Sequence, residues 1–108
     1  MKFYPLEKLH CLQHGYRKTF SVAGRNLLLL QDEDQTYLIE NRCPHQGAPL
    51  EKGLVKNGTI VCPYHRLAFS LYDGKHINNS SYSCQKSLSC YKPRYQDNLI
   101  GVLLDESP

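Results

Sequence analysis

The sequence lacks several features that would assign it to a large class of proteins. Its longest leucine run, Leu27 to Leu30, has four residues, whereas a membrane-spanning helix needs about 20 apolar residues. The first residues, Met1–Pro5, contain no apolar core of a secretory signal. We therefore expect no membrane segment and a cytoplasmic protein.

Strong charge of one sign is also missing. The formal net charge of +3 is far from the clustered basic face of a nucleic-acid-binding protein, so we expect no nucleic-acid partner. A glycine-rich nucleotide fingerprint is absent too, so we expect no nucleotide-binding site of that kind. The sequence also contains no convincing Ser/His/Asp or Cys/His nucleophile set, so we expect no catalytic residues.

Short apolar runs separated by turn residues fill the chain. Asn57-Gly58 separates residues 53–55 from 59–61, and Asp73-Gly74 separates 68–71 from 75–77. Asn-Gly and Asp-Gly between apolar runs are the strongest short signals of a β-hairpin. Further apolar runs cover residues 20–22, 26–30, 36–39, 89–95 and 99–104.

This pattern predicts an all-β fold, an antiparallel sandwich or barrel, as one domain over residues 1–108. We expect at most one short helical turn in Pro5–Leu12 and a long irregular connection over Asn78–Ser89.

Two short segments combine cysteine with histidine. Cys43-Pro44-His45 is followed after sixteen residues by Cys62-Pro63-Tyr64-His65. Thiolate suits iron–sulfur clusters and zinc, and imidazole suits iron and zinc alike. A Rieske-type [2Fe–2S] cluster takes two Cys on one iron and two His on the other. We interpret Cys43, His45, Cys62 and His65 as the ligands of one such cluster. We expect the two segments at the tips of neighbouring hairpins, the first after the strand 36–39 and the second between the strands 59–61 and 68–71.

Zinc is the alternative for these four residues. Zinc sites commonly begin with paired cysteines and end with paired histidines, whereas each segment here mixes the two. The iron–sulfur interpretation is therefore favoured. Gly47 and Gly53 would let backbone amides approach closely, and Pro44 and Pro63 would stiffen the loops.

Three cysteines remain outside the two segments. This odd number, Cys11, Cys84 and Cys90, does not indicate a disulfide framework. Cys84 and Cys90 could pair if their strands met, but reduced thiols in a reducing compartment are favoured.

With their flanks, residues 43–50 (CPHQGAPL) and 62–69 (CPYHRLAF) resemble the two cluster loops of Rieske ferredoxins. The resemblance extends from about Lys2 to Asp105 and is generic outside the two loops. It implies a small cluster-binding subdomain set into an antiparallel β-sandwich. It also implies that Cys43 and Cys62 hold the inner iron, while His45 and His65 hold the outer iron through Nδ1.

The sequence is similar to ferredoxins that feed aromatic-ring-hydroxylating oxygenases and to small subunits of NADH-dependent nitrite reductases. The resemblance implies a monomeric one-electron carrier between a flavoprotein-like reductase and a terminal oxygenase or reductase. A tightly held nitrite reductase subunit and, with less support, a redox sensor are the alternatives. An oxygenase would need a further 2-His-1-carboxylate iron site, and His10, His14 and His76 form no suitable constellation.

The resemblance also implies a low reduction potential. High-potential Rieske proteins join their two loops by a disulfide. The equivalent positions here are Ala48 and Tyr64, which have no thiol, so this disulfide cannot form. The high-potential proteins also place hydroxyl donors at the positions of Leu67 and Phe69, and neither side chain can donate. Hydrogen bonds to cluster sulfur raise the potential, so their absence lowers it.

Overall fold

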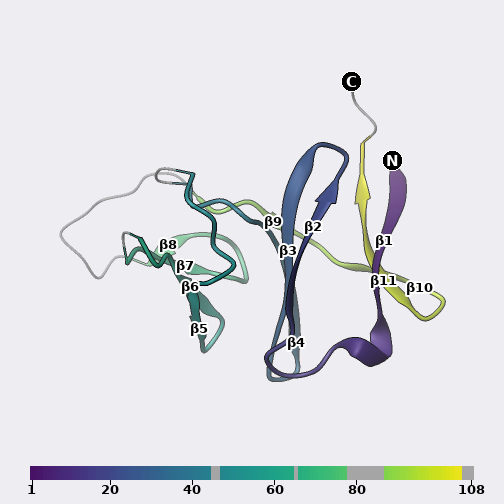
Figure 1. Cartoon of the computed structure of the whole chain (residues 1–108), viewed down its shortest axis with the longest axis horizontal. Helices are drawn as coiled ribbons and strands as arrows, with labels where there is room; N and C mark the ends of the chain where they lie inside the picture. The colour runs from purple at the N-terminus through teal and green to yellow at the C-terminus, as the bar shows by residue number, and fades with distance from the viewer. Residues whose placement is uncertain (45–46, 65, 78–86, 106–108) are drawn as a thin grey trace.

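The computed structural model describes residues 1–44, 47–64, 66–77 and 87–105 of the chain (Figure 1). These residues form three antiparallel sheets, as the hairpin signals predicted, and one short 3-10 turn, Leu9–Cys11. The first sheet has the order β1 (Lys2–Lys8), β11 (Leu99–Leu104), β10 (Arg94–Gln96). The second has the order β2 (Arg17–Val22), β3 (Arg25–Asp32), β4 (Gln35–Glu40), β9 (Cys90–Tyr91). The third has the order β5 (Leu54–Lys56), β6 (Thr59–Val61), β7 (Ala68–Ser70), β8 (His76–Ile77).

The sheet of β2, β3, β4 and β9 is the middle layer, and the leucine run of β3 shows why. Successive side chains of a strand point to opposite faces. Leu27 and Leu29 pack with Ile100 and Val102 of β11 in the core of the sandwich. Leu28 and Leu30 face the other way, into a second core with β6 and β7. Both faces of β3 are therefore buried, which explains four consecutive leucines without exposed apolar surface.

The three layers lie side by side along the longest axis of the molecule. In Figure 1 the sheet β5–β8 occupies one end, β2–β4 the middle, and β1, β10 and β11 the other end. We call residues 41–77 the cluster subdomain, because they contain this end sheet and both Cys/His segments. The expected sandwich with a small subdomain is confirmed. Among the described residues no helix has the length and apolarity to cross a bilayer.

Two strand predictions differ from the structure. Residues 2–8 form β1, where the sequence pattern predicted no strand; β1 is an edge strand, which tolerates proline, and a bulge lies between Pro5 and Glu7. The apolar run 89–95 forms two short strands in different sheets, β9 beside β4 and β10 beside β11. Pro93, which has no backbone N–H, lies between them.

Candidate metal centre

Cys43 and Cys62 begin two loops at the end of the cluster subdomain. Both side chains are fully buried and belong to one core cluster with Leu50, Leu67 and Phe69. The second loop connects β6 and β7, the hairpin that the sequence predicted. The first loop was also expected at a hairpin tip, which is wrong, because β4 and β5 belong to different sheets. It is instead the crossing from the middle sheet to the end sheet.

The two loops share one backbone hydrogen-bond pattern. The Cys43 N–H donates to the Ala48 carbonyl at 2.7 Å, and the Gly47 N–H donates to the Cys43 carbonyl at 2.7 Å. In the second loop the Cys62 N–H donates to the Leu67 carbonyl and the Arg66 N–H to the Cys62 carbonyl, both at 2.8 Å. Each cysteine thus accepts a backbone hydrogen bond from the fifth residue of its turn and donates one to the sixth.

The fifth residue of each loop has a positive φ, 79° at Gly47 and 57° at Arg66. Glycine adopts this conformation freely, whereas for other residues it costs about 1–2 kcal/mol. The sequence pattern indicated the special role of Gly47. It could not indicate that Arg66 occupies the equivalent position, because arginine carries no signal for this conformation.

His45 and His65, the other two predicted ligands, are not among the described residues. In the sequence each falls within one of the two closed turns. Two buried thiols on matching turns, each turn containing one histidine in its sequence, fit the donor set of a [2Fe–2S] cluster with two Cys and two His ligands. Elsewhere in the described part of the chain, no group of three or more Cys, His, Asp or Glu could hold a metal ion.

Asn41 holds the first loop closed. Its side chain is only 6% exposed, and its Oδ1 accepts a hydrogen bond from the buried Leu50 N–H at 2.7 Å. Its own backbone N–H donates to the Asn26 carbonyl of β3. The hydrogen bond between Leu50 and Asn41 therefore connects the end of the loop to its start, where the chain leaves β4. No sequence signal indicates this role, since asparagine is common in loops.

Arg17 of β2 fastens the same region to the sandwich. Its guanidinium donates to the carbonyls of Glu51 at 2.8 Å and Gly53 at 2.7 Å. A Cβ on Gly53 would lie 2.6 Å from the carbonyl oxygen of Val61, the residue before Cys62. Gly53 therefore allows the two ligand segments to approach, as the sequence had suggested.

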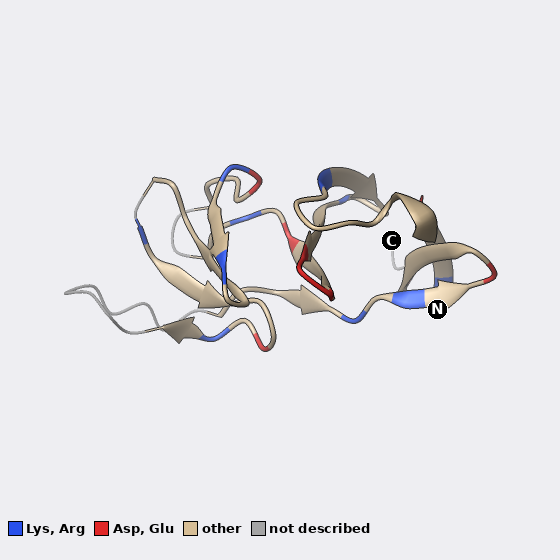
Figure 2. Ribbon diagram, turned by 90° about the horizontal axis from the view of Figure 1, so that it is seen from below, with Lys and Arg blue, Asp and Glu red and all other residues tan. Residues whose placement is uncertain are grey.

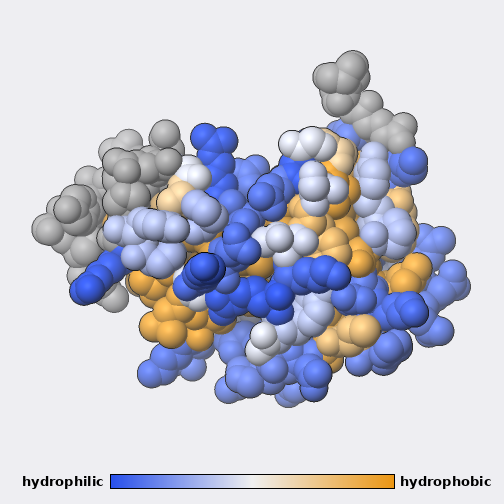
Figure 3. Space-filling model, viewed as in Figure 1, coloured by the Kyte–Doolittle hydropathy of each residue, from blue (hydrophilic) through white to orange (hydrophobic). Residues whose placement is uncertain are grey.

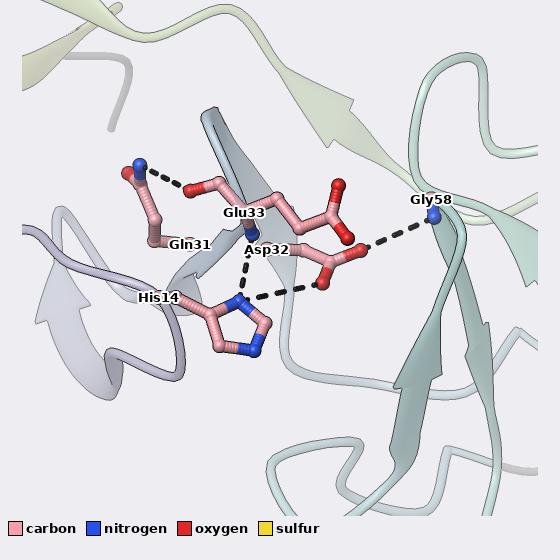
Figure 4. A network of polar contacts seen from close by, with 5 residues as sticks. All are labelled: His14, Gln31, Asp32, Glu33 and Gly58. Carbon is pink, nitrogen blue, oxygen red and sulfur yellow. Dashed lines mark hydrogen bonds and ion pairs between the residues drawn. The ribbon is translucent and has the colours of Figure 1, made fainter.

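The acidic turn between β3 and β4 forms a further tie, shown in Figure 4. Asp32 Oδ2 accepts a hydrogen bond from the Gly58 N–H at 3.3 Å, and its Oδ1 lies 3.8 Å from His14 Nδ1. His14 Nδ1 in turn accepts a hydrogen bond from the Glu33 N–H at 2.8 Å. The structure uses Asp32 to hold the β5–β6 hairpin.

Leu67 and Phe69 line the core next to Cys62 and are fully buried. The Phe69 ring lies 5.5 Å from the His76 ring, centroid to centroid. High-potential Rieske proteins, by the resemblance described above, carry hydroxyl donors at these two positions. Here both positions carry hydrocarbon side chains, which pack in the same core as Cys62.

The remaining thiols have separate surroundings. Within the described residues Cys11 and Cys90 are free thiols, while Cys84 is not described. Cys90 Sγ lies 3.7 Å from the Leu71 carbonyl oxygen. Burial, and then the nearby charge of Asp73, raise the pKa of the Cys90 thiol to about 11. Cys90 is thus held in its neutral form, the state expected of a structural thiol.

Comparison with known proteins agrees with this geometry. The Rieske [2Fe-2S] domain family matches residues 2–92. The ferredoxin component of an alkene monooxygenase system from Xanthobacter autotrophicus is 31% identical over 75 residues, covering 68% of this chain and 62% of the relative. Two other curated relatives are much longer, and the chain covers 10% of their length.

Solved structures show the same fold. The ferredoxin of carbazole 1,9a-dioxygenase from Nocardioides aromaticivorans superposes with a TM-score of 0.79 at 25% identity, covering 94% of this chain and 97% of that chain. A putative small subunit of a nitrite reductase has a TM-score of 0.74 at 20% identity, covering 96% of this chain and all of that chain. The cofactor of the matched family is the [2Fe–2S] cluster. From its sequence match, its loops and its fold, the chain belongs to the Rieske [2Fe-2S] domain family.

Proposed function

We propose that the chain is a low-potential one-electron carrier whose cluster is held by Cys43, His45, Cys62 and His65, within a single domain over residues 1–108. The observation that supports the ligand set is the pair of fully buried thiols on turns with the same hydrogen-bond pattern. When bound, the cluster supplies reversible one-electron transfer.

The residues of the chain position and tune that group. Leu67 and Phe69 exclude water from the inner side of the second loop. Asn41 and Arg17 fix the first loop and its exit to the sandwich. A rigid site of this kind changes little between two oxidation states, which favours fast electron transfer.

We propose a flavoprotein-like reductase as the electron donor and a terminal oxygenase as the acceptor, with the carrier acting as a monomer in the cytoplasm. The ferredoxin relatives named above support the oxygenase. The likeness to the nitrite reductase subunit concerns the fold. That alternative predicts a stable complex that survives gel filtration of the native protein, whereas a carrier elutes alone.

The cluster content of the purified protein tests the proposal. We expect about two irons and two acid-labile sulfides per chain and a brown colour. Cys43→Ser and Cys62→Ser should abolish this content, whereas the matched variants Cys11→Ser and Cys90→Ser should keep it. Stoichiometric zinc without iron, after anaerobic expression with iron supplied, would refute the proposal.

The histidine ligands need a separate measurement. Protein labelled with ¹⁵N only in histidine should show nitrogen couplings from two imidazoles in the pulsed electron-nuclear resonance spectrum of the reduced state. His14→Ala should leave these couplings unchanged, while His45→Ala should remove one of them or the whole cluster. Labelled protein with no histidine coupling would show an all-thiolate cluster instead.

A further inference from the structure

The charge of this chain is unevenly distributed. Residues 41–77, the cluster subdomain, contain five Lys or Arg and two Asp or Glu. The remainder of the chain contains eight basic and eight acidic residues, so the whole net charge of +3 falls in the cluster subdomain. In the oxidised state the formal charge of an iron–sulfide core cancels the charges of its two thiolate ligands. Loading the cluster therefore leaves this excess in place.

The basic side chains of the cluster subdomain are exposed. These residues are Arg42, Lys52, Lys56, Arg66 and Lys75. In Figure 2 basic segments are spread over this part of the ribbon, while the acidic β3–β4 turn lies between the subdomain and the rest of the sandwich. That turn is engaged with His14 and Gly58, as described above.

Two of the five flank the proposed ligands directly. Arg42 precedes Cys43, and its Nε lies 3.2 Å from the place that a Cβ on Gly47 would take, so the guanidinium packs along the first loop. Arg66 follows His65 and occupies the left-handed position of the second loop. Arg42 also lines a hollow of about 350 Å³ together with Arg25 and Glu40. Two of the five positive charges therefore adjoin the proposed ligands.

Exposed apolar side chains accompany these charges. Five large apolar residues are exposed in the described part of the chain, and three of them, Leu54, Tyr64 and Tyr72, lie in the cluster subdomain. Tyr64 is 64% exposed and is the neighbour of His65. Figure 3 shows an apolar patch over the β5 region on the face in view. Tyr and Arg are enriched in protein interfaces, and this mixture fits a protein surface better than a nucleic-acid backbone.

We propose that the cluster end of this chain docks on an acidic face of its redox partner protein, with Arg42 and Arg66 guiding the approach. This inference rests on the proposed electron-carrier function. A basic end facing carboxylates raises the rate of encounter and orients the cluster toward the partner. Such steering weakens as salt screens the charges.

The test uses the cluster-loaded protein and two small redox probes of opposite charge. The reduced protein gives one electron to hexacyanoferrate(III), which becomes hexacyanoferrate(II), and the rate is followed by stopped-flow absorbance. With this anion the rate should fall as ionic strength rises. With the cation hexaamminecobalt(III), which also accepts one electron, the rate should rise. At about 10 mM ionic strength the Debye length is about 30 Å, so the effect is largest there.

Two double variants with the same net charge locate the effect. Arg42→Gln with Arg66→Asn removes two charges beside the ligands, and asparagine tolerates the positive φ of residue 66. Lys8→Gln with Arg94→Gln removes two exposed charges from β1 and β10. We expect the first pair to slow hexacyanoferrate(III) by about fivefold or more and the control pair by less than about twofold.

Equal slowing by both pairs, with the cluster intact in each, would overturn the inference and show that only total charge matters. Binding of the wild type, but not of the first double variant, to phosphatidylserine vesicles at physiological salt would also overturn it in favour of a membrane surface. A protein that contains no cluster would instead refute the electron-carrier proposal, so the two failures are distinct.

Discussion

At the scale of single residues, Cys43 and Cys62 lie among hydrocarbon side chains. Burial disfavours added negative charge, and neither Leu67 nor Phe69 can donate a hydrogen bond to sulfur, so the cluster should be harder to reduce than one with hydroxyl donors at these two positions. Leu67 and Phe69 pack in the same core as Cys62, and a hydroxyl can be introduced at either position, with little change in shape at Phe69. They provide a direct test of how the chain sets its potential.

Leu67→Ser and Phe69→Tyr should each raise the midpoint potential of the cluster. A hydroxyl hydrogen bond that favours the reduced state by about 1 kcal/mol corresponds to a rise of about 40 mV for one electron. Protein-film voltammetry measures the shift, and Leu67→Ala serves as the control without a hydroxyl. Equal shifts in Leu67→Ser and Leu67→Ala would show that solvent access, rather than the donor, controls the potential.

Cys90 should react slowly with iodoacetamide in the folded protein. Its pKa is raised from 9.0 to about 11, so at pH 8 its thiolate fraction is about a hundredfold smaller than in the unfolded chain. Because the folded pKa is the higher one, this contribution to stability is complete below pH 9 and is lost as the pH rises through about 11. Peptide mapping after timed alkylation at pH 8, in the presence and absence of urea, measures the ratio. Similar rates in both conditions would contradict the assigned burial.

At the scale of elements, β3 joins the two cores of the molecule. Leu28 belongs to the core of the cluster subdomain and Leu29 to the core of the sandwich, although they are neighbours in the chain. The first ligand loop then leaves β4 and crosses to the end sheet, closed by Asn41. The stability of the site therefore depends on the middle sheet as well as on its own loops.

Leu28→Ala and Leu29→Ala should weaken different parts of the protein. Each removes a fully buried side chain and should lower the free energy of unfolding by about 2–5 kcal/mol. Hydrogen exchange should accelerate first in β5–β7 for Leu28→Ala and first in β1 and β11 for Leu29→Ala. The same pattern of exchange in both variants would contradict the two-core arrangement.

Asn41→Leu should destabilise the first ligand loop. The substitution leaves the buried Leu50 N–H without its acceptor, which costs about 1–3 kcal/mol. We expect faster loss of iron to a chelator and a lower urea midpoint. Asn98→Leu, at an exposed position before β11, should change stability by about 0.5 kcal/mol or less. Iron loss at the wild-type rate in Asn41→Leu would show that the loop is held by other contacts.

The hairpins of β5–β8 and the strand β11 were predictable because Asn57-Gly58 and Asp73-Gly74 have local turn chemistry and residues 99–104 form one apolar run. The roles of Arg17, Asn41 and Asp32 were not, because each contacts a residue distant in the sequence or acts through a backbone carbonyl or N–H group. The first loop was misplaced for the same reason, since strand partners in different sheets leave no local signal. Of the four predicted ligands, Cys43 and Cys62 lie in one core, and the ligand roles of all four residues stay predictions.

At the scale of the whole molecule, three layered sheets place the proposed cluster at one end and leave β1, β10 and β11 at the other (Figure 1). The all-β class and the sandwich with a small subdomain followed from the sequence, whereas the middle layer with two buried faces did not. The net charge of the chain lies at the cluster end. This arrangement suits a carrier that meets its partners with one end.

The reduction potential of the cluster tests the central claim, a low-potential Rieske carrier, most directly. Protein-film voltammetry of the wild-type protein at pH 7 should give a one-electron midpoint near the lower limit of the range of roughly −150 to +300 mV for Rieske centres. Such a potential suits an electron carrier fed by an NADH-dependent reductase. A midpoint well above 0 mV would contradict the account and favour a quinol-linked role.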